Sequence, residues 1–133
     1  MQVAPSAPGL FTMGATTVAA ATAQRYGGDG AALGAVPVFD CGSGTCAAVP
    51  IPLDAQSTVF LTLYGTGIRH GIAVSCTVGG LPAAVQFAGA QGQYPGFDQV
   101  NIQLPVTLQG KGTANVVVTV DGHPSNTVQI AIQ

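Results

Sequence analysis

Alternation of apolar and polar residues over short stretches is the feature that most constrains the fold of this chain. The clearest case is the stretch 99–104, in which Val100, Ile102 and Leu104 alternate with polar residues. Successive side chains of a β-strand point to opposite faces, so this pattern predicts a strand with one buried face. An amphipathic helix would instead need apolar residues three and four positions apart.

Similar stretches recur through the second half of the chain, and turn-forming residues such as Gly79-Gly80 and Asp121-Gly122 separate them. Short strands divided by regularly spaced turns are typical of an all-β sandwich. We therefore predict an Ig-like antiparallel β-sandwich of about 7–9 strands. The further strands are expected at 59–64, 72–78, 83–87, 115–120 and 127–133. In the last two, the residues expected to face inward are Val116, Val118, Val120, Val128, Ile130 and Ile132.

The first part of the chain, 1–56, is less regular. Its Ala/Thr-rich stretch 16–26 is interpreted as a strand or an irregular edge, because the β-branched residues at its start disfavour a helix. The proline-containing stretch 49–53 is expected at a sheet edge, since proline cannot donate to a central ladder. No linker or change of composition divides the chain, so residues 1–133 are expected to form a single domain.

Charged residues make up only 6% of the chain, and the net charge is -2. Proteins that bind nucleic acid neutralise phosphates with a basic face, which Arg25, Arg69 and Lys111 cannot provide, so no nucleic-acid partner is expected. Long charged helices are excluded for the same lack of charge. No apolar run is long enough to span a bilayer, so no membrane insertion is expected.

The three cysteines are interpreted in two ways. Cys41 and Cys46 enclose a flexible Gly-Ser-Gly-Thr loop that allows a disulfide bond between them. A zinc site would need four ligands, and a second cysteine pair is missing. Cys76 shares an apolar strand face with Ile72 and Val78, so it is expected to be a buried free thiol.

Neither catalysis nor metal binding is expected. The serines, histidines and aspartates form no recognisable nucleophile motif, so the sequence predicts no enzyme activity and no cofactor. Asp29, Asp40 and Asp54 are the candidates for a calcium site at one end of the sandwich. Calcium takes six to eight oxygen ligands, however, and no closely spaced run of acidic residues supplies them, so no metal is predicted.

Short motifs that follow one another in a fixed order identify a known family. They are APGLFT at 7–12, LYGTGI at 63–68, VGGLPAAV at 78–85, FAG at 87–89 and PGFDQVN at 95–101, before a final Val-rich hairpin. In this order the chain resembles the Solibacter-type C-terminal domain, an Ig-like module similar to IPT/TIG domains of secreted acidobacterial proteins. The resemblance covers nearly the whole chain. It implies an extracellular or cell-surface location and other domains of a parent protein as partners, and it transfers no catalytic residues.

The first function that remains open is a non-catalytic structural or interaction module of a secreted or cell-surface bacterial protein. The low charge leaves sheet edges with few of the lysines that normally block edge pairing. The module is therefore expected to associate with copies of itself through its edges, and the stretches 3–12 and 127–133 are the expected participants. The alternative is a monomer whose edges are covered by its own proline-rich loops around Pro50 and Pro52.

The alternative function is a carbohydrate-binding module that uses the loop 91–97. Gln91, Gln93, Tyr94 and Phe97 supply two aromatic rings and two amide side chains that could contact a glycan. The simpler interpretation of this loop is that both aromatic rings anchor it in the core.

Overall fold

The computed structural model describes residues 8–42 and 44–133. The chain has an almost entirely β, sandwich-like fold, as predicted. Its named strands pair antiparallel, and the described part of the chain contains twelve of them, more than the predicted 7–9 because several are very short. The elements are β1 (Gly9–Leu10), β2 (Ala21–Gly27), β3 (Ala32–Val36), β4 (Phe39–Asp40), β5 (Ala47–Ala48), β6 (Ser57–Thr66), β7 (Val74–Val78), β8 (Leu81–Ala90), β9 (Asp98–Gln103), the 3-10 helix η1 (Val106–Leu108), β10 (Gly112–Val120), β11 (His123–Pro124) and β12 (Val128–Ile132).

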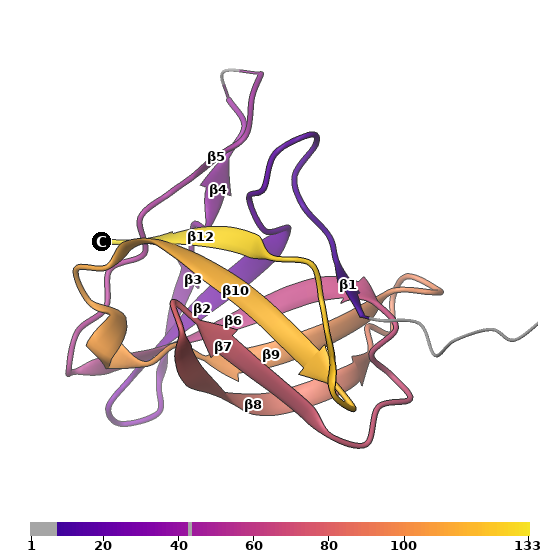
Figure 1. Ribbon diagram of the computed structural model, residues 1–133. Coiled ribbons are helices and arrows are strands. Elements are labelled where there is room, and N and C mark those ends of the chain that lie inside the picture. Colours follow the sequence, from indigo (N-terminus) through magenta and orange to yellow (C-terminus); the bar gives the residue numbers. More distant parts are fainter. Residues whose placement is uncertain (1–7, 43) are drawn as a thin grey trace, which may run out of the picture.

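Two layers share the strand β8. Its first residues, 81–83, pair with β7, and residues 84–90 pair with β9. One layer therefore runs β3-β2-β6-β9-β8, and the other runs β8-β7-β10-β12. In Figure 1, β10 crosses in front of β6, and the buried side chains of both strands belong to one core, so the inner faces of the two layers pack against each other.

The alternating apolar residues form one core between the two layers. The predicted inward faces of β9, β10 and β12 are confirmed, because their apolar side chains are buried. Such burial removes apolar surface from water and is the main stabilising contribution to a sandwich of this kind. The side chains with at most 1% exposure include Leu61, Leu63, Val100, Ile102, Val116, Val118, Val128 and Ile130.

The prediction for Ile72 is wrong. We expected it to share the buried face of Cys76, but its side chain is 96% exposed, whereas Cys76 is buried as a free thiol. β7 begins only at Val74, because the N–H groups of Ile72 and Ala73 donate to the carboxylate of Asp121 instead of to a neighbouring strand. The residue therefore lies in a turn, outside the period-two pattern.

The outer edge of β12 is covered by segments from the first half of the chain. Gln129 bonds to residues 17–19 through its N–H and its C=O, at 2.8 and 2.9 Å. The N–H of Ile51 donates to Ala131 O at 2.9 Å, and its C=O accepts from Gln133 N at 3.0 Å. The prediction that 127–133 offers a free edge is therefore wrong, since these backbone groups already have partners within the chain.

The other expected participant in edge pairing, 3–12, is described only from residue 8 onward, so 3–7 lie outside the described residues. β1 pairs with the end of β6, with Gly9 opposite Thr66 and Leu10 opposite Gly65. This part of the stretch is therefore also used within the chain.

A disulfide bond joins Cys41 and Cys46, as predicted. It closes the end of a small arm in which β4 and β5 pair with each other and with no strand of the large sheet. Figure 1 shows this arm projecting away from the sandwich. No helix within 8–42 and 44–133 is long and apolar enough to cross a membrane.

Candidate functional site

The loop between β8 and β9 has a fixed conformation because its own residues hold it. The side-chain oxygen of Gln91 accepts hydrogen bonds from the N–H groups of Gln93 and Tyr94, at 2.8 and 2.9 Å. The backbone closes the loop, since Gln91 N–H donates to Phe97 O and Phe97 N–H donates to Tyr94 O. Gln91 is therefore a residue that positions the loop, and its oxygen is already occupied.

The segment after β1 lies beside this loop. Phe11 N–H donates to Tyr64 O at 2.8 Å, and Phe11 O accepts from Ala20 N–H at 2.9 Å. The amide of Asn126 holds the preceding residue, because its Oδ1 accepts from Leu10 N–H at 2.7 Å and its Nδ2 donates to Leu10 O at 3.0 Å. These bonds bring Phe11 to the surface formed by the loop.

Gly65 allows β1 to approach β6 at this point. A Cβ atom at Gly65 would lie 2.1 Å from the carbonyl oxygen of Gly9, a distance that no side chain can occupy. Gly67 has φ +75°, whereas Gly65 is required for the close approach of the two backbones.

An aromatic groove of about 250 Å³ results between the loop and the segment after β1. The ring centroids of Phe11 and Phe97 are 4.9 Å apart in an edge-to-face contact, and those of Tyr94 and Phe97 are 5.6 Å apart. Tyr94 is 60% exposed and Phe97 is 39% exposed, so neither ring is anchored in the core. The residues lining the aromatic groove are Phe11, Ala20, Tyr64, Gln91, Gln93, Tyr94 and Phe97.

All four residues that the sequence nominated in this loop line the aromatic groove. Sequence reasoning missed its other wall, Phe11, Ala20 and Tyr64. Periodicity indicates which face of a strand is buried, but it does not indicate that β1 pairs with a strand more than fifty residues further along the chain. The lack of a side chain at Gly65 was the available signal, because it permits the close approach of β1 to β6.

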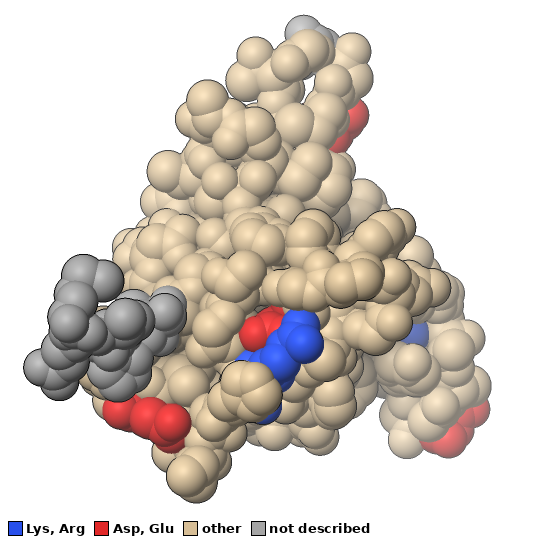
Figure 2. Space-filling model, turned by 90° about the vertical axis from the view of Figure 1, so that its right-hand side faces the viewer, with Lys and Arg blue, Asp and Glu red and all other residues tan. Residues whose placement is uncertain are grey.

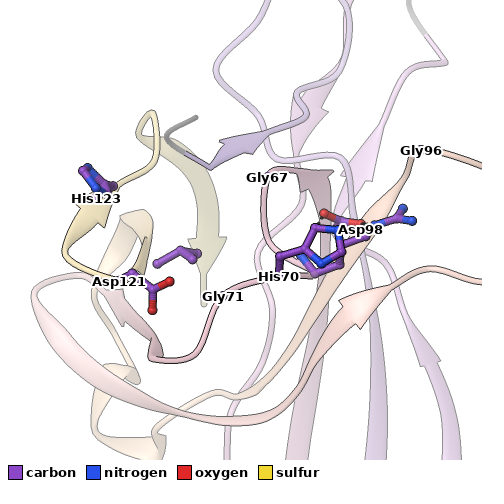
Figure 3. A pocket seen from close by; sticks show the side chains of 9 residues that line it. Gly67, His70, Gly71, Gly96, Asp98, Asp121 and His123 are labelled. Carbon is purple, nitrogen blue, oxygen red and sulfur yellow. Dashed lines mark hydrogen bonds and ion pairs between the residues drawn. The ribbon is translucent and has the colours of Figure 1, made fainter. Parts of the chain in front are cut away.

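A larger cavity of about 540 Å³ lies next to the aromatic groove and is more polar in its side chains. Its lining comes from the loop between β6 and β7, from the end of the β8–β9 loop and the start of β9, and from the turn that joins β10 to β11. In Figure 3, His70 and Asp98 lie on one side of this polar cavity, and Asp121 and His123 lie on the other.

Asp98 is the buried charged residue of the described chain, with 2% exposure. Its carboxylate accepts from Ile68 N–H at 2.8 Å, from Arg69 N–H at 3.0 Å and from Arg69 Nε at 2.5 Å. Burial alone would raise the pKa of Asp98, but these hydrogen bonds and the Arg69 charge outweigh it and lower the pKa below its ordinary value. The charge therefore fixes the loop after β6 against the start of β9.

Asp121 acts in the same way on the opposite side of the polar cavity. It has a positive φ of 49°, and its Oδ1 accepts from the N–H groups of Ile72 and Ala73. Within residues 8–42 and 44–133, no hydrogen bond joins His70 or His123 to a serine or an aspartate. Asp98, Arg69 and Asp121 thus hold loops, and among the described residues no hydrogen bond pairs a nucleophile with a histidine base in this cavity.

Each of the three aspartates considered as calcium ligands accepts hydrogen bonds from residues of its own turn. Asp29 accepts from Ala31 N–H, Asp40 from Gly42 N–H, and Asp54 from Gln56 N–H and Ser57 Oγ. The described residues contain no group of three His, Cys, Asp or Glu side chains that could hold a metal ion. The structure does not bring the three aspartates together into one site.

Cys76 offers no reactive group. Burial raises the pKa of its thiol to about 12, so the thiolate that would act as a nucleophile does not form near neutral pH.

The aromatic groove and the polar cavity open at one end of the sandwich. This end is on the right of Figure 1 and faces the viewer in Figure 2, where most of the surface is uncharged. A small patch of basic and acidic side chains lies near its centre, and a few separate charged side chains lie toward its margins. The Arg69 side chain connects the two hollows, because its Nη2 donates to Phe97 O at 3.1 Å. Comparisons with known proteins found no matching family model, no matching curated protein and no matching solved structure.

Proposed function

We propose that this chain is a non-catalytic interaction module of a secreted or cell-surface bacterial protein and that the aromatic groove is its binding site. The observation that carries this proposal is a concave surface with two exposed aromatic rings on a loop that is already held in place. A preformed site loses little conformational freedom on binding, which favours affinity. Exposed aromatic rings are common in surfaces that bind other molecules.

Three observations support a secreted or cell-surface location. The disulfide bond between Cys41 and Cys46 is typical of an oxidising environment. The low content of charged residues and the resemblance to a module of secreted acidobacterial proteins agree with it.

Carbohydrate is the ligand class that the groove fits best. The flat faces of Tyr94 and Phe97 can stack on the C–H face of a sugar ring, while the Gln93 amide and the Tyr64 hydroxyl can bond to sugar hydroxyls. The groove is lined by no charged residue, so a neutral sugar is favoured over an acidic one. The neighbouring carboxylates support binding without chemistry, since Asp98 and Asp121 both accept backbone hydrogen bonds that hold loops.

The test is a glycan array, followed by calorimetric titration with the soluble oligosaccharide that gives the strongest signal. Tyr94→Ala should weaken binding about tenfold or more, equivalent to about 1.4 kcal/mol, because it removes the most exposed ring of the groove. The matched control is Phe87→Ala, which removes an aromatic ring that is 46% exposed but lies outside the groove.

Binding that survives Tyr94→Ala unchanged would place the ligand elsewhere. An array without any signal for the wild-type protein would contradict carbohydrate as the ligand class. Circular dichroism of both variants shows whether a loss of binding comes from a loss of fold.

A further inference from the structure

β3 is an uncovered edge of the large sheet. It stands at the end of the strand order with β2 as its neighbour, and no other described segment hydrogen-bonds to its outer side. Its residues 32–35 are exposed, and Leu33 has 60% exposure. This edge differs from β12, whose outer side is already hydrogen-bonded within the chain.

The direction of the backbone groups follows from the pairing of β2. Gly27 N–H donates to Ala31 O across the β2–β3 turn, and bonding direction alternates along a strand. The backbone N–H and C=O groups of Ala23 and Arg25 therefore also point toward β3. The same groups of their partners, Val36 and Gly34, consequently point toward β2. The residue between these partners, Ala35, consequently turns its N–H and C=O outward to where a further strand would lie.

Natural sheet edges are commonly blocked by charges, bulges or proline. The stretch 30–39 contains no charged residue, so no charge blocks this edge. A bulge at Leu33, which lies between the residues paired with Arg25 and Tyr26, and Pro37 directly after the strand limit the length that can pair. Pairing through this edge is therefore short, which implies a weak and concentration-dependent association.

The edge is complementary to itself. Leu33 projects from one end of β3, and an uncharged groove of about 400 Å³, formed by β2 and residues 35–39, lies at the other end. A two-fold axis through the middle of an antiparallel strand pair brings the start of each strand to the end of the other. Centred on Ala35, this arrangement places Leu33 of each copy opposite Pro37 of the other, beside the groove.

We propose that two copies of this chain associate through antiparallel pairing of β3 with β3, which extends the sheet across the dimer. Ala35 supplies the outward backbone N–H and C=O to its counterpart, and Leu33 supplies the apolar contact at each end. No charge of one β3 meets a like charge of the other. This association uses a surface separate from the aromatic groove and does not depend on sugar binding.

Sedimentation velocity over a hundredfold range of concentration tests the proposal. The wild-type protein should shift from monomer toward dimer, and Leu33→Lys should remain monomeric, because each copy would bring a charge into the contact. The matched control is Ile72→Lys, which replaces another exposed apolar residue away from β3 and should associate like the wild type.

A cross-linking experiment locates the axis. Ala35→Cys places two thiols opposite each other across the proposed axis, so mild oxidation should give a disulfide-linked dimer in high yield. Ala84→Cys, at an exposed position on β8, should give little. Retention of the buried Cys76 and the Cys41–Cys46 bond in all variants leaves the added thiol as the accessible one.

A wild-type protein that stays monomeric throughout would overturn the dimer. A dimer that persists in Leu33→Lys, with no preference for cross-linking at residue 35, would contradict β3 as its contact. Both results are independent of the glycan titration, so a failure of this proposal is distinguishable from a failure of the groove.

Discussion

Residues 57–133 contain the longest strands, which pair over many consecutive residues, whereas residues 8–56, apart from β2 and β3, form two-residue strands and isolated bridges. β6 and β8 each contain ten residues, while β1, β4 and β5 contain two. The first half nevertheless contributes to the fold, because it covers the edge of β12 and forms one wall of the aromatic groove. The long paired strands of residues 57–133 form most of the core, whereas short segments of residues 8–56 cover the β12 edge and line part of the aromatic groove.

The largest expected effect lies in the regular half. Ile102→Ala should lower the free energy of unfolding by about 2–5 kcal/mol, because it leaves a cavity at a fully buried position between the layers. Ile72→Ala, at the exposed position that we expected to be buried, should change it by less than about 0.5 kcal/mol. Urea denaturation of both variants checks this difference, and equal effects would contradict the assignment of the core.

A second variant acts where the two halves meet. Gly65→Ala should cost about 1–3 kcal/mol, because its Cβ cannot occupy the space of the Gly9 carbonyl and β1 must move away. Gly9→Ala is the matched control, since its Cβ would lie 3.4 Å from Thr66 Oγ1, in ordinary contact. Hydrogen exchange at the Phe11 amide, which donates to Tyr64 O, should increase in Gly65→Ala alone. Unchanged exchange there would show that β1 does not depend on the close approach.

A third prediction concerns the loop after β6, whose backbone N–H groups donate to the Asp98 carboxylate instead of to a neighbouring strand. Asp98→Asn should cost about 1–2 kcal/mol at neutral pH, because it weakens the charged hydrogen bonds to Ile68 and Arg69. The pKa of Asp98 is lowered in the folded protein, so its contribution to stability is present above the ordinary value of about 3.9 and is lost as the pH falls below it.

The unfolding free energy of the wild type should therefore fall on acidification from pH 5 to pH 2, and Asp98→Asn should remove part of this fall. Asp29→Asn, an exposed turn residue, is the control and should retain it. Identical pH profiles of Asp98→Asn and the wild type would refute the role of this charge.

The smallest effect is expected in the projecting arm. Closing a loop as short as that between Cys41 and Cys46 is worth about 2 kcal/mol in the chain-entropy account. The arm pairs with no strand of the large sheet. Loss of the disulfide bond should therefore open the arm locally and lower the free energy of unfolding of the whole domain by less than about 1 kcal/mol. Limited proteolysis of the Cys41→Ser, Cys46→Ser double variant should cut the arm before the sandwich unfolds. A large drop of the urea midpoint would instead make the arm part of the cooperative fold.

The sequence by itself determined the fold class, the inward faces of β9, β10 and β12, the disulfide bond and the burial of Cys76. These features depend on residues close together in the chain, because alternation along a strand and a short cysteine spacing are local properties. The loop 91–97 was identified for the same reason, since its residues are contiguous.

Only the tertiary structure decided which edges are free and what forms the second wall of the groove. The outer side of β12 is covered by residues 17–19 and 51, and β3, which the sequence did not indicate as a strand, is left open. Phe11 reaches the loop through the pairing of Leu10 with Gly65. Every residue except proline can form the same backbone hydrogen bonds, whatever its side chain. Pairing between distant segments therefore cannot be identified from composition or periodicity, and only the folded structure shows which segments pair.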